Sequence, residues 1–168
     1  REGGTTSVGT LLLECLDDLP HDYHFSAGLA HGDFTPWNMF LTRDQLNLYD
    51  WEAAMRFAPN LFDLFHYHFQ TGIYLKKWSF NEVYAQIKFS IEAHSNLENE
   101  IKVHGIDVKR HLQMYLLHTI SRHLTLKLMA PLEVDISEAK LAIWKDALVF
   151  VLPNAVDQRI GFISEFET

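Results

Sequence analysis

One short segment interrupts a chain that otherwise follows the helical repeat. Over most of the 168 residues, apolar side chains recur every three or four positions, which predicts amphipathic helices. Between residues 38 and 50 the pattern instead alternates, in two short runs separated by Arg43-Asp44-Gln45. Two alternating runs around a polar link predict a β-hairpin. The sequence therefore favours a mainly α fold with one small β-hairpin.

Capping and stop signals delimit the helical segments. Pro20 ends the first apolar run, and Ser79 with Glu82 matches a capping box at the start of another. A second capping box is expected at Asp135–Glu138, opening a helix that ends before Pro153. The expected helices cover about residues 10–19, 61–75, 79–96, 107–129 and 135–152.

Composition narrows the class of protein and partner. Hydrophobic residues make up 48% of the chain, which argues against disorder. The 22 acidic and 14 basic residues give a formal charge of −8, which disfavours nucleic acid as a partner and suits a cationic or neutral ligand better. A single cysteine, Cys15, permits no disulfide within the chain and fits the cytoplasm. The longest apolar run, residues 147–152, is too short to span a membrane.

Three oxygen-bearing side chains are expected to meet at the open end of the hairpin. Asp33 and Asn38 precede the first strand, and Asp50 ends the returning strand. A carboxylate beside an amide oxygen suits Mg²⁺, so Asn38 and Asp50 form a candidate metal site. Asp33 then remains to accept a hydrogen bond from a hydroxyl group. These are the minimum parts for phosphoryl transfer from a metal-bound nucleotide.

The same segments resemble a known family. HGDFTPWN (31–38), YDWEAA (49–54) and NLFDLFHY (60–67) occur in the order found in the aminoglycoside phosphotransferase and choline kinase group, which are kinase-like enzymes acting on small molecules. The resemblance is strong over about residues 29–66 and extends to the helical remainder only in general character.

The resemblance implies a role for each residue of the motif. Asp33 would be the catalytic base, and Asn38 and Asp50 would hold the Mg²⁺ that accompanies ATP, the co-substrate. Glu52 would contact the metal or the substrate, or make a surface ion pair.

Three more residues would support the catalytic loop. His31 and Gly32 would shape it, and Asp63 would buttress it by accepting backbone hydrogen bonds. Gly32 stands where protein kinases commonly have Arg, and only 12 residues lie between Asp50 and Asp63, too few for a long activation loop. A hydroxyl group on a small molecule, such as an aminoglycoside, an amino alcohol like choline, or a sugar, is therefore the expected acceptor, and an acidic chain slightly favours a cationic one.

The parts that bind ATP in that group are not recognisable in this sequence. It contains no glycine-rich loop in a strand context and no strand lysine with a partner Glu. We therefore interpret residues 1–168 as a kinase-like C-terminal lobe, cut from a longer protein whose N-terminal nucleotide lobe is absent from this chain. Residues 1–28 would form a lead-in helix and link, 29–52 the catalytic loop and metal-binding hairpin, and 60–168 the helical substrate side.

Four alternatives remain open at this stage. Asp33 and Asn38 are common turn residues, so the loop alone is compatible with a plain turn. The chain is also compatible with a catalytically degenerate kinase fold that serves as a binding or scaffold module. The ten histidines raise the alternative of a zinc site, although they lack the converging spacing that zinc requires. Histidines that are buried and hydrogen-bonded are therefore favoured over zinc ligands. The aromatic residues between 67 and 84 favour core packing over a cage for a quaternary ammonium group.

Overall fold

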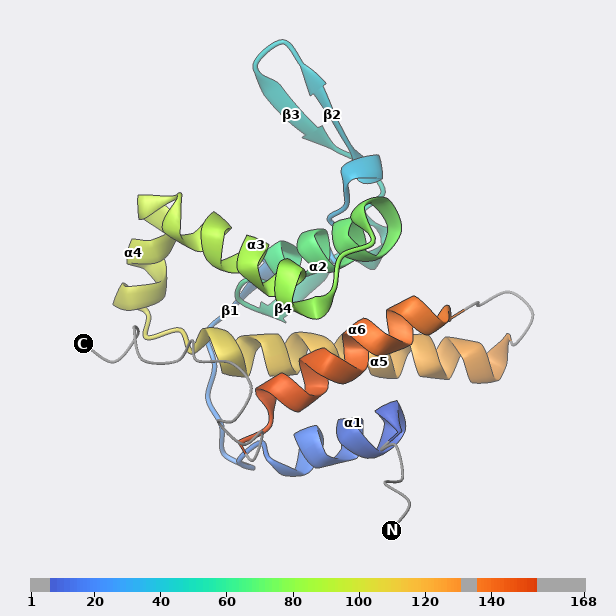
Figure 1. Ribbon diagram of the computed structural model, residues 1–168. Coiled ribbons are helices and arrows are strands. Elements are labelled where there is room, and N and C mark those ends of the chain that lie inside the picture. The colour runs from blue at the N-terminus through green and yellow to red at the C-terminus, as the bar shows by residue number, and fades with distance from the viewer. Residues whose placement is uncertain (1–6, 131–135, 154–168) are drawn as a thin grey trace.

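Helices make up most of the computed structural model, which describes residues 7–130 and 136–153 (Figure 1). Two small antiparallel sheets of two strands each complete the described part. The prediction of a mainly α fold with a small hairpin is therefore confirmed. Within these residues, no helix combines the length and the apolar character needed to cross a bilayer.

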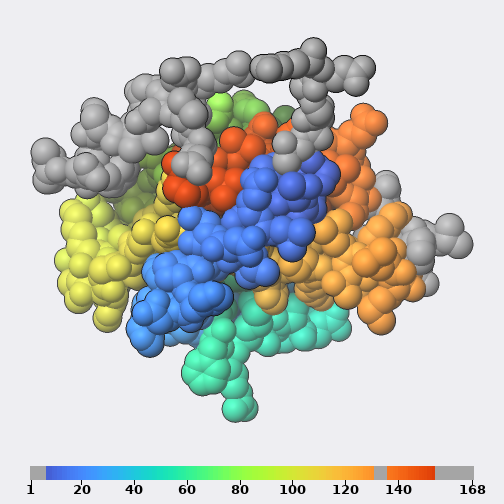
Figure 2. Space-filling view, turned by 90° about the horizontal axis from the view of Figure 1, so that it is seen from below, coloured from blue at the N-terminus to red at the C-terminus, as the bar shows by residue number. Residues whose placement is uncertain are grey.

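Three helices pack together on one side of the molecule. α1 (Val8–Asp17), α5 (Val108–Met129) and α6 (Glu138–Val151) pack against one another, and Figure 2 shows α1 lying across one face beside the other two. Side chains cap each of them at the N-terminus, through Ser7, Asp107 and Ser137. The cap of α6 is therefore Ser137, and the Asp135 of the expected capping box lies outside the described residues.

The core forms where α2 (Phe62–Gln70) packs on α5, which in turn packs on α6. Its fully buried large side chains include Phe65, Phe69, Tyr115 and Trp144. Burying one such side chain contributes roughly 1.5–3 kcal/mol. Cys15 lies in the same core, and burial raises the pKa of its thiol to about 11, so it acts as a small apolar residue.

The predicted helix over 61–75 changes its hydrogen bonding midway. After α2 the chain continues as a π-helix, η3 (Thr71–Lys76). Gly72 lies in this segment against Val83, and a Cβ at this position would meet Val83 Cγ2 at 2.6 Å. The missing side chain therefore allows the close approach of the two segments.

The helix predicted over 79–96 is shorter than expected. α3 (Phe80–Glu92) begins at the capping box of Ser79 and Glu82, as predicted, but ends at Glu92. A separate helix, α4 (Ser95–Val103), follows after a break at Ala93-His94. The expectation of one continuous helix was wrong because the acidic, polar sequence past residue 92 carries no clear stop signal.

The predicted hairpin is present as β2 (Met39–Thr42) and β3 (Gln45–Leu48). Thr42 pairs with Gln45, so the turn has two residues rather than three, and Arg43 adopts a positive φ of 53°. Figure 1 shows the hairpin projecting away from the helices.

A second sheet was not predicted. β1 (Ala27–Ala30) pairs with β4 (Met55–Pro59), and the pairing brings the two ends of residues 31–54 together below the hairpin. The AGLA run of β1 has too few alternating residues to indicate a strand, so the sequence interpretation placed part of it in a polar link. Two short 3₁₀ turns, η1 (Pro36–Asn38) and η2 (Trp51–Ala53), flank the hairpin.

Candidate active site

Asp63 ties the loop that follows β1 to the first turn of α2. Its Oδ2 accepts a hydrogen bond from the backbone N–H of His31 at 2.7 Å, and its Oδ1 accepts one from the N–H of Gly32 at 3.0 Å. This is the kind of contact that the family resemblance implies for Asp63. The loop is therefore fixed by a charged group on a core helix, and hydrogen bonds to charged groups are stronger than neutral ones.

His31 links this loop to the segment before Asp50. The buried imidazole lies between two backbone groups: Nε2 donates to the carbonyl of Tyr49 at 3.0 Å, and Nδ1 accepts from the N–H of Asp33 at 3.3 Å. These partners assign the proton to Nε2. The ring also packs against Trp51, with centroids 4.6 Å apart.

Gly32 is required by the close approach of two backbone segments. It adopts a φ of 82°, and a Cβ there would lie 2.1 Å from the carbonyl oxygen of Ala53. The loop that contains Gly32 thus packs directly on η2, the turn that follows Asp50. An arginine, which protein kinases commonly have at this position, does not fit this arrangement.

Hydrogen bonds hold the carboxylate of Asp33 on both oxygens. Oδ2 accepts from Nδ2 of Asn38 at 2.7 Å, and Oδ1 lies 3.0 Å from Nε2 of His66. The pKa of Asp33 is lowered, chiefly by the hydrogen bond with His66. The charge of His66 and the hydrogen bond from Asn38 lower it further, and together these contacts outweigh burial, which raises the pKa. The side chain is 37% exposed. Asp33 is therefore an oriented carboxylate that stays ionised and remains open to a ligand.

Asn38 and Asp50 lie at the open end of the hairpin, as the strand pairing requires. The carbonyl of Asn38 accepts from the N–H of Tyr49 at 3.1 Å. Nδ2 of the buried Asn38 side chain donates to both the backbone oxygen and the carboxylate of Asp33, so Oδ1 is left as the atom available for a metal ion. Asp50 is exposed, with a left-handed φ of 65°.

The donor set fits Mg²⁺ better than a metal held by the protein alone. Across residues 7–130 and 136–153, no group of three or more His, Cys, Asp or Glu side chains is placed to hold a metal ion. Mg²⁺ is commonly bound through one or two side chains, with waters and substrate phosphates completing its octahedron. The amide oxygen of Asn38 and the carboxylate of Asp50 are ligands of the chemical type that Mg²⁺ prefers, at the two ends of the hairpin. Glu52, in η2, is exposed and lies two residues beyond Asp50.

Aromatic rings border the loop around Asp33. Phe34 contacts Tyr67 of α2, with ring centroids 6.0 Å apart, and Trp37 meets Tyr74 of η3 edge to face at 5.9 Å. The hydroxyl of Tyr49 also donates to the carbonyl of Trp37. These contacts fix η1, and with it Asn38, between the hairpin and the helices.

Sequence reasoning missed His66. It was interpreted as one of several structural histidines, yet it contacts Asp33 directly. The signal lay in helical spacing: His66 follows Asp63 by three residues, so both side chains lie on the same face of α2. His68 points elsewhere, with Nε2 2.9 Å from Oγ of Ser90 on α3.

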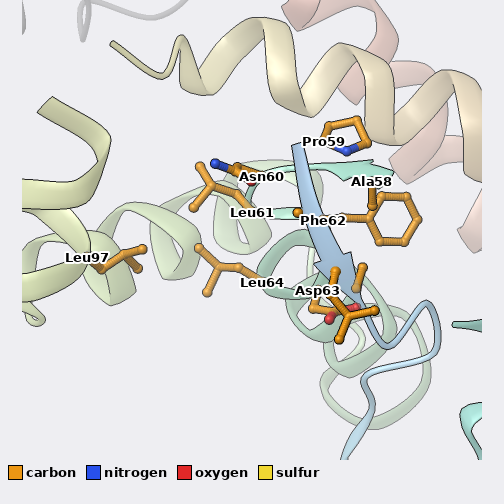
Figure 3. A pocket seen from close by; sticks show the side chains of 11 residues that line it. Ala58, Pro59, Asn60, Leu61, Phe62, Asp63, Leu64 and Leu97 are labelled. Carbon is orange, nitrogen blue, oxygen red and sulfur yellow. The ribbon is translucent and has the colours of Figure 1, made fainter. Parts of the chain in front are cut away.

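A separate cavity of about 230 Å³ lies beside the same strands (Figure 3). It is bordered by β1, β4, the start of α2 and Leu97 of α4, and Asp63 is part of its wall. Asp33, Asn38 and Asp50 do not line it. The candidate active site is therefore an open surface at the base of the hairpin rather than this cavity.

Comparisons of the chain with protein families, with curated proteins and with solved structures find no match.

Proposed function

We propose that this chain is the catalytic and substrate-binding lobe of a kinase that transfers phosphate from ATP, with Mg²⁺, to a hydroxyl group of a small molecule. The acceptor class is an aminoglycoside, an amino alcohol such as choline, or a sugar. A nucleotide lobe elsewhere in the parent protein would complete the site, as the family resemblance implies.

One observation carries this proposal: a single hydrogen-bond network arranges the polar residues that the motif places in order along the chain. Asp63 holds the backbone on which Asp33 sits, and Asp33 in turn orients the amide of Asn38. A turn that merely reverses the chain needs no buried histidine and no second carboxylate to fix it. The cooperation of these groups favours a prearranged site over a plain turn.

The residues divide the chemistry between them. Asp33 accepts a hydrogen bond from the acceptor hydroxyl and orients its oxygen for attack on the terminal phosphate of ATP. As the new phosphate ester forms, the bond from the terminal phosphorus to the bridging oxygen breaks, ADP leaves, and Asp33 takes the proton of the hydroxyl. Asn38 and Asp50 would hold Mg²⁺, which supplies positive charge to the phosphate oxygens when it is bound. Asp33 is ionised near neutral pH, and its lowered pKa makes it a weak proton acceptor, so its main contribution is to orient the hydroxyl group and to take the proton late, as the new bond forms.

The proposal is tested by ATP consumption with the product of the whole gene, because the resemblance covers only the catalytic lobe. The enzyme is screened with Mg²⁺ against amino alcohols, aminosugars and sugars. Asp33→Asn should lower turnover on the best acceptor by roughly 10³-fold or more. Asp44→Asn, at the exposed tip of the hairpin, is the matched control and should leave turnover unchanged.

Two results would count against the kinase. Near-normal turnover in Asp33→Asn removes the assigned base. A folded protein that consumes no ATP with any acceptor, and shows no Mg²⁺-dependent nucleotide binding, supports the binding or scaffold module instead.

A further inference from the structure

We infer that His66 is a positioning residue for Asp33, fixing the carboxylate through a buried hydrogen-bond chain that begins on α5. This inference rests on the proposed function, because it assigns the role of His66 in the same reaction. His66 lies within the motif segment 60–67, but the resemblance assigns it no role.

The first link joins His66 to the carboxylate. Nε2 of His66 lies 3.0 Å from Oδ1 of Asp33. An ionised carboxylate only accepts hydrogen bonds, so Nε2 carries the proton and donates it. The side chain of His66 is 8% exposed and that of Asp33 is 37% exposed, so the imidazole lies behind the carboxylate. An acceptor molecule that reaches Asp33 therefore does not touch His66.

The second link joins His66 to the core. Nδ1 of His66 lies 3.5 Å from the hydroxyl of Tyr115, which is fully buried on α5. Burial raises the pKa of Tyr115 far above its ordinary value, so the phenol keeps its proton and can donate it to Nδ1. Thr119, one turn further along α5, hydrogen-bonds to Tyr115 in turn. The ring of Phe62 stacks on the imidazole, nearly parallel to it, with centroids 6.3 Å apart.

The two links together fix the plane of the carboxylate. Asn38 binds Oδ2 and His66 binds Oδ1, so rotation about the last side-chain bond breaks at least one of these contacts. Each oxygen accepts one hydrogen bond in this arrangement and keeps a lone pair for the acceptor hydroxyl. Without His66, Asn38 alone would hold the carboxylate. The angle at which the acceptor hydroxyl approaches the phosphate would then vary.

The kinetic test uses two replacements of similar length. The amide of Gln reaches the position of Nε2 and can donate to Asp33, whereas Met fills the same space without a donor. In the full-length enzyme, His66→Met should lower kcat by about 10–100-fold, with KM for ATP unchanged, because geometry rather than nucleotide binding is lost. His66→Gln should recover most of kcat. Equal denaturation midpoints for the two variants exclude a difference in folding.

A spectroscopic test reads the contact without any activity. The ¹⁵N NMR spectrum of His66 at about pH 8 should show a protonated Nε2 and an unprotonated Nδ1. Asp33→Asn should shift the Nε2–H signal, and Tyr115→Phe should shift the Nδ1 signal. An unprotonated Nε2, or no response to Asp33→Asn, overturns the inference whatever the kinetics show.

The two tests separate the failure of this inference from failure of the proposed function. If Asp33→Asn abolishes turnover but His66→Met keeps a normal kcat, the kinase stands and the positioning role is wrong. If Asp33→Asn is fully active, the proposed function fails and the positioning role fails with it, even where the NMR contact is present.

Discussion

The loop of residues 31–38 and the hairpin of residues 39–48 adjoin at Asn38 but are held in different ways. Asp63, His66 and Asn38 fix the loop through hydrogen bonds to its backbone and to Asp33. The strands of the hairpin pair only with each other, and they carry exposed apolar residues such as Leu41, which is 71% exposed. The fold therefore prearranges Asp33, whereas Asp50 lies at the end of a projecting element. This contrast predicts that stability is sensitive to the loop and tolerant of the hairpin.

The largest loss of stability is expected for Gly32→Ala. The new Cβ would clash with the carbonyl of Ala53 at 2.1 Å, in a backbone conformation that alanine disfavours. The expected cost is about 3 kcal/mol or more of unfolding free energy, measured by urea denaturation. Gly105→Ala is the matched control: φ is also positive, at 57°, but nothing lies within 4 Å of the new Cβ. It should cost about 1 kcal/mol, and equal losses in the two variants would refute the close packing of the loop.

The second-largest loss of stability is expected for Asp63→Asn. The amide oxygen can accept from only one of the two N–H groups of His31 and Gly32, and its NH₂ group would face the other. Leaving one N–H unsatisfied should cost about 1–3 kcal/mol of unfolding free energy. A loss below about 0.5 kcal/mol in urea denaturation would show that the loop does not depend on this anchor.

Acid should weaken the loop through Asp33, with a smaller effect because the carboxylate is partly exposed. Its pKa is lowered in the folded state, chiefly by the hydrogen bond from His66. The stability that Asp33 contributes is therefore complete above its ordinary pKa of 3.8 and is lost as the pH falls through the lower, folded-state value. Unfolding of the wild type and of Asp33→Asn should be compared from about pH 6 to about pH 2. The wild type should lose more stability, and parallel curves would contradict this linkage.

Asp50→Asn should have the smallest effect on stability. The side chain is exposed, and Asn tolerates the left-handed φ of 65° as well as Asp does. The unfolding free energy should change by less than about 0.5 kcal/mol. On the proposed function, the same variant should lose Mg²⁺-dependent nucleotide binding, measured by calorimetry with the full-length protein. A large loss of stability would place Asp50 in the fixed part of the site and remove the contrast between loop and hairpin.

Local patterns were sufficient to predict the elements that depend on neighbouring residues. The hairpin followed from alternation over 38–50, and the start of α3 followed from Ser79 and Glu82. The β1–β4 pairing, the π-helix and the break before α4 were missed. The first two depend on contacts between separate segments: Gly28 pairs with Ala58, and Gly72 lies against Val83. The break before α4 was missed because the sequence past residue 92 carries no clear stop signal.

The sequence by itself determined which polar groups stand near the hairpin. The spacing of Asp33, Asn38 and Asp50 around two short strands is a local property, because a hairpin brings its own ends together. Only the tertiary structure decided what lies behind Asp33. His66 reaches that carboxylate from α2, and Tyr115 contacts His66 from α5. The spacing from Asp63 places His66 on the right face of α2, but only the packing of α2 on α5 brings Tyr115 behind it.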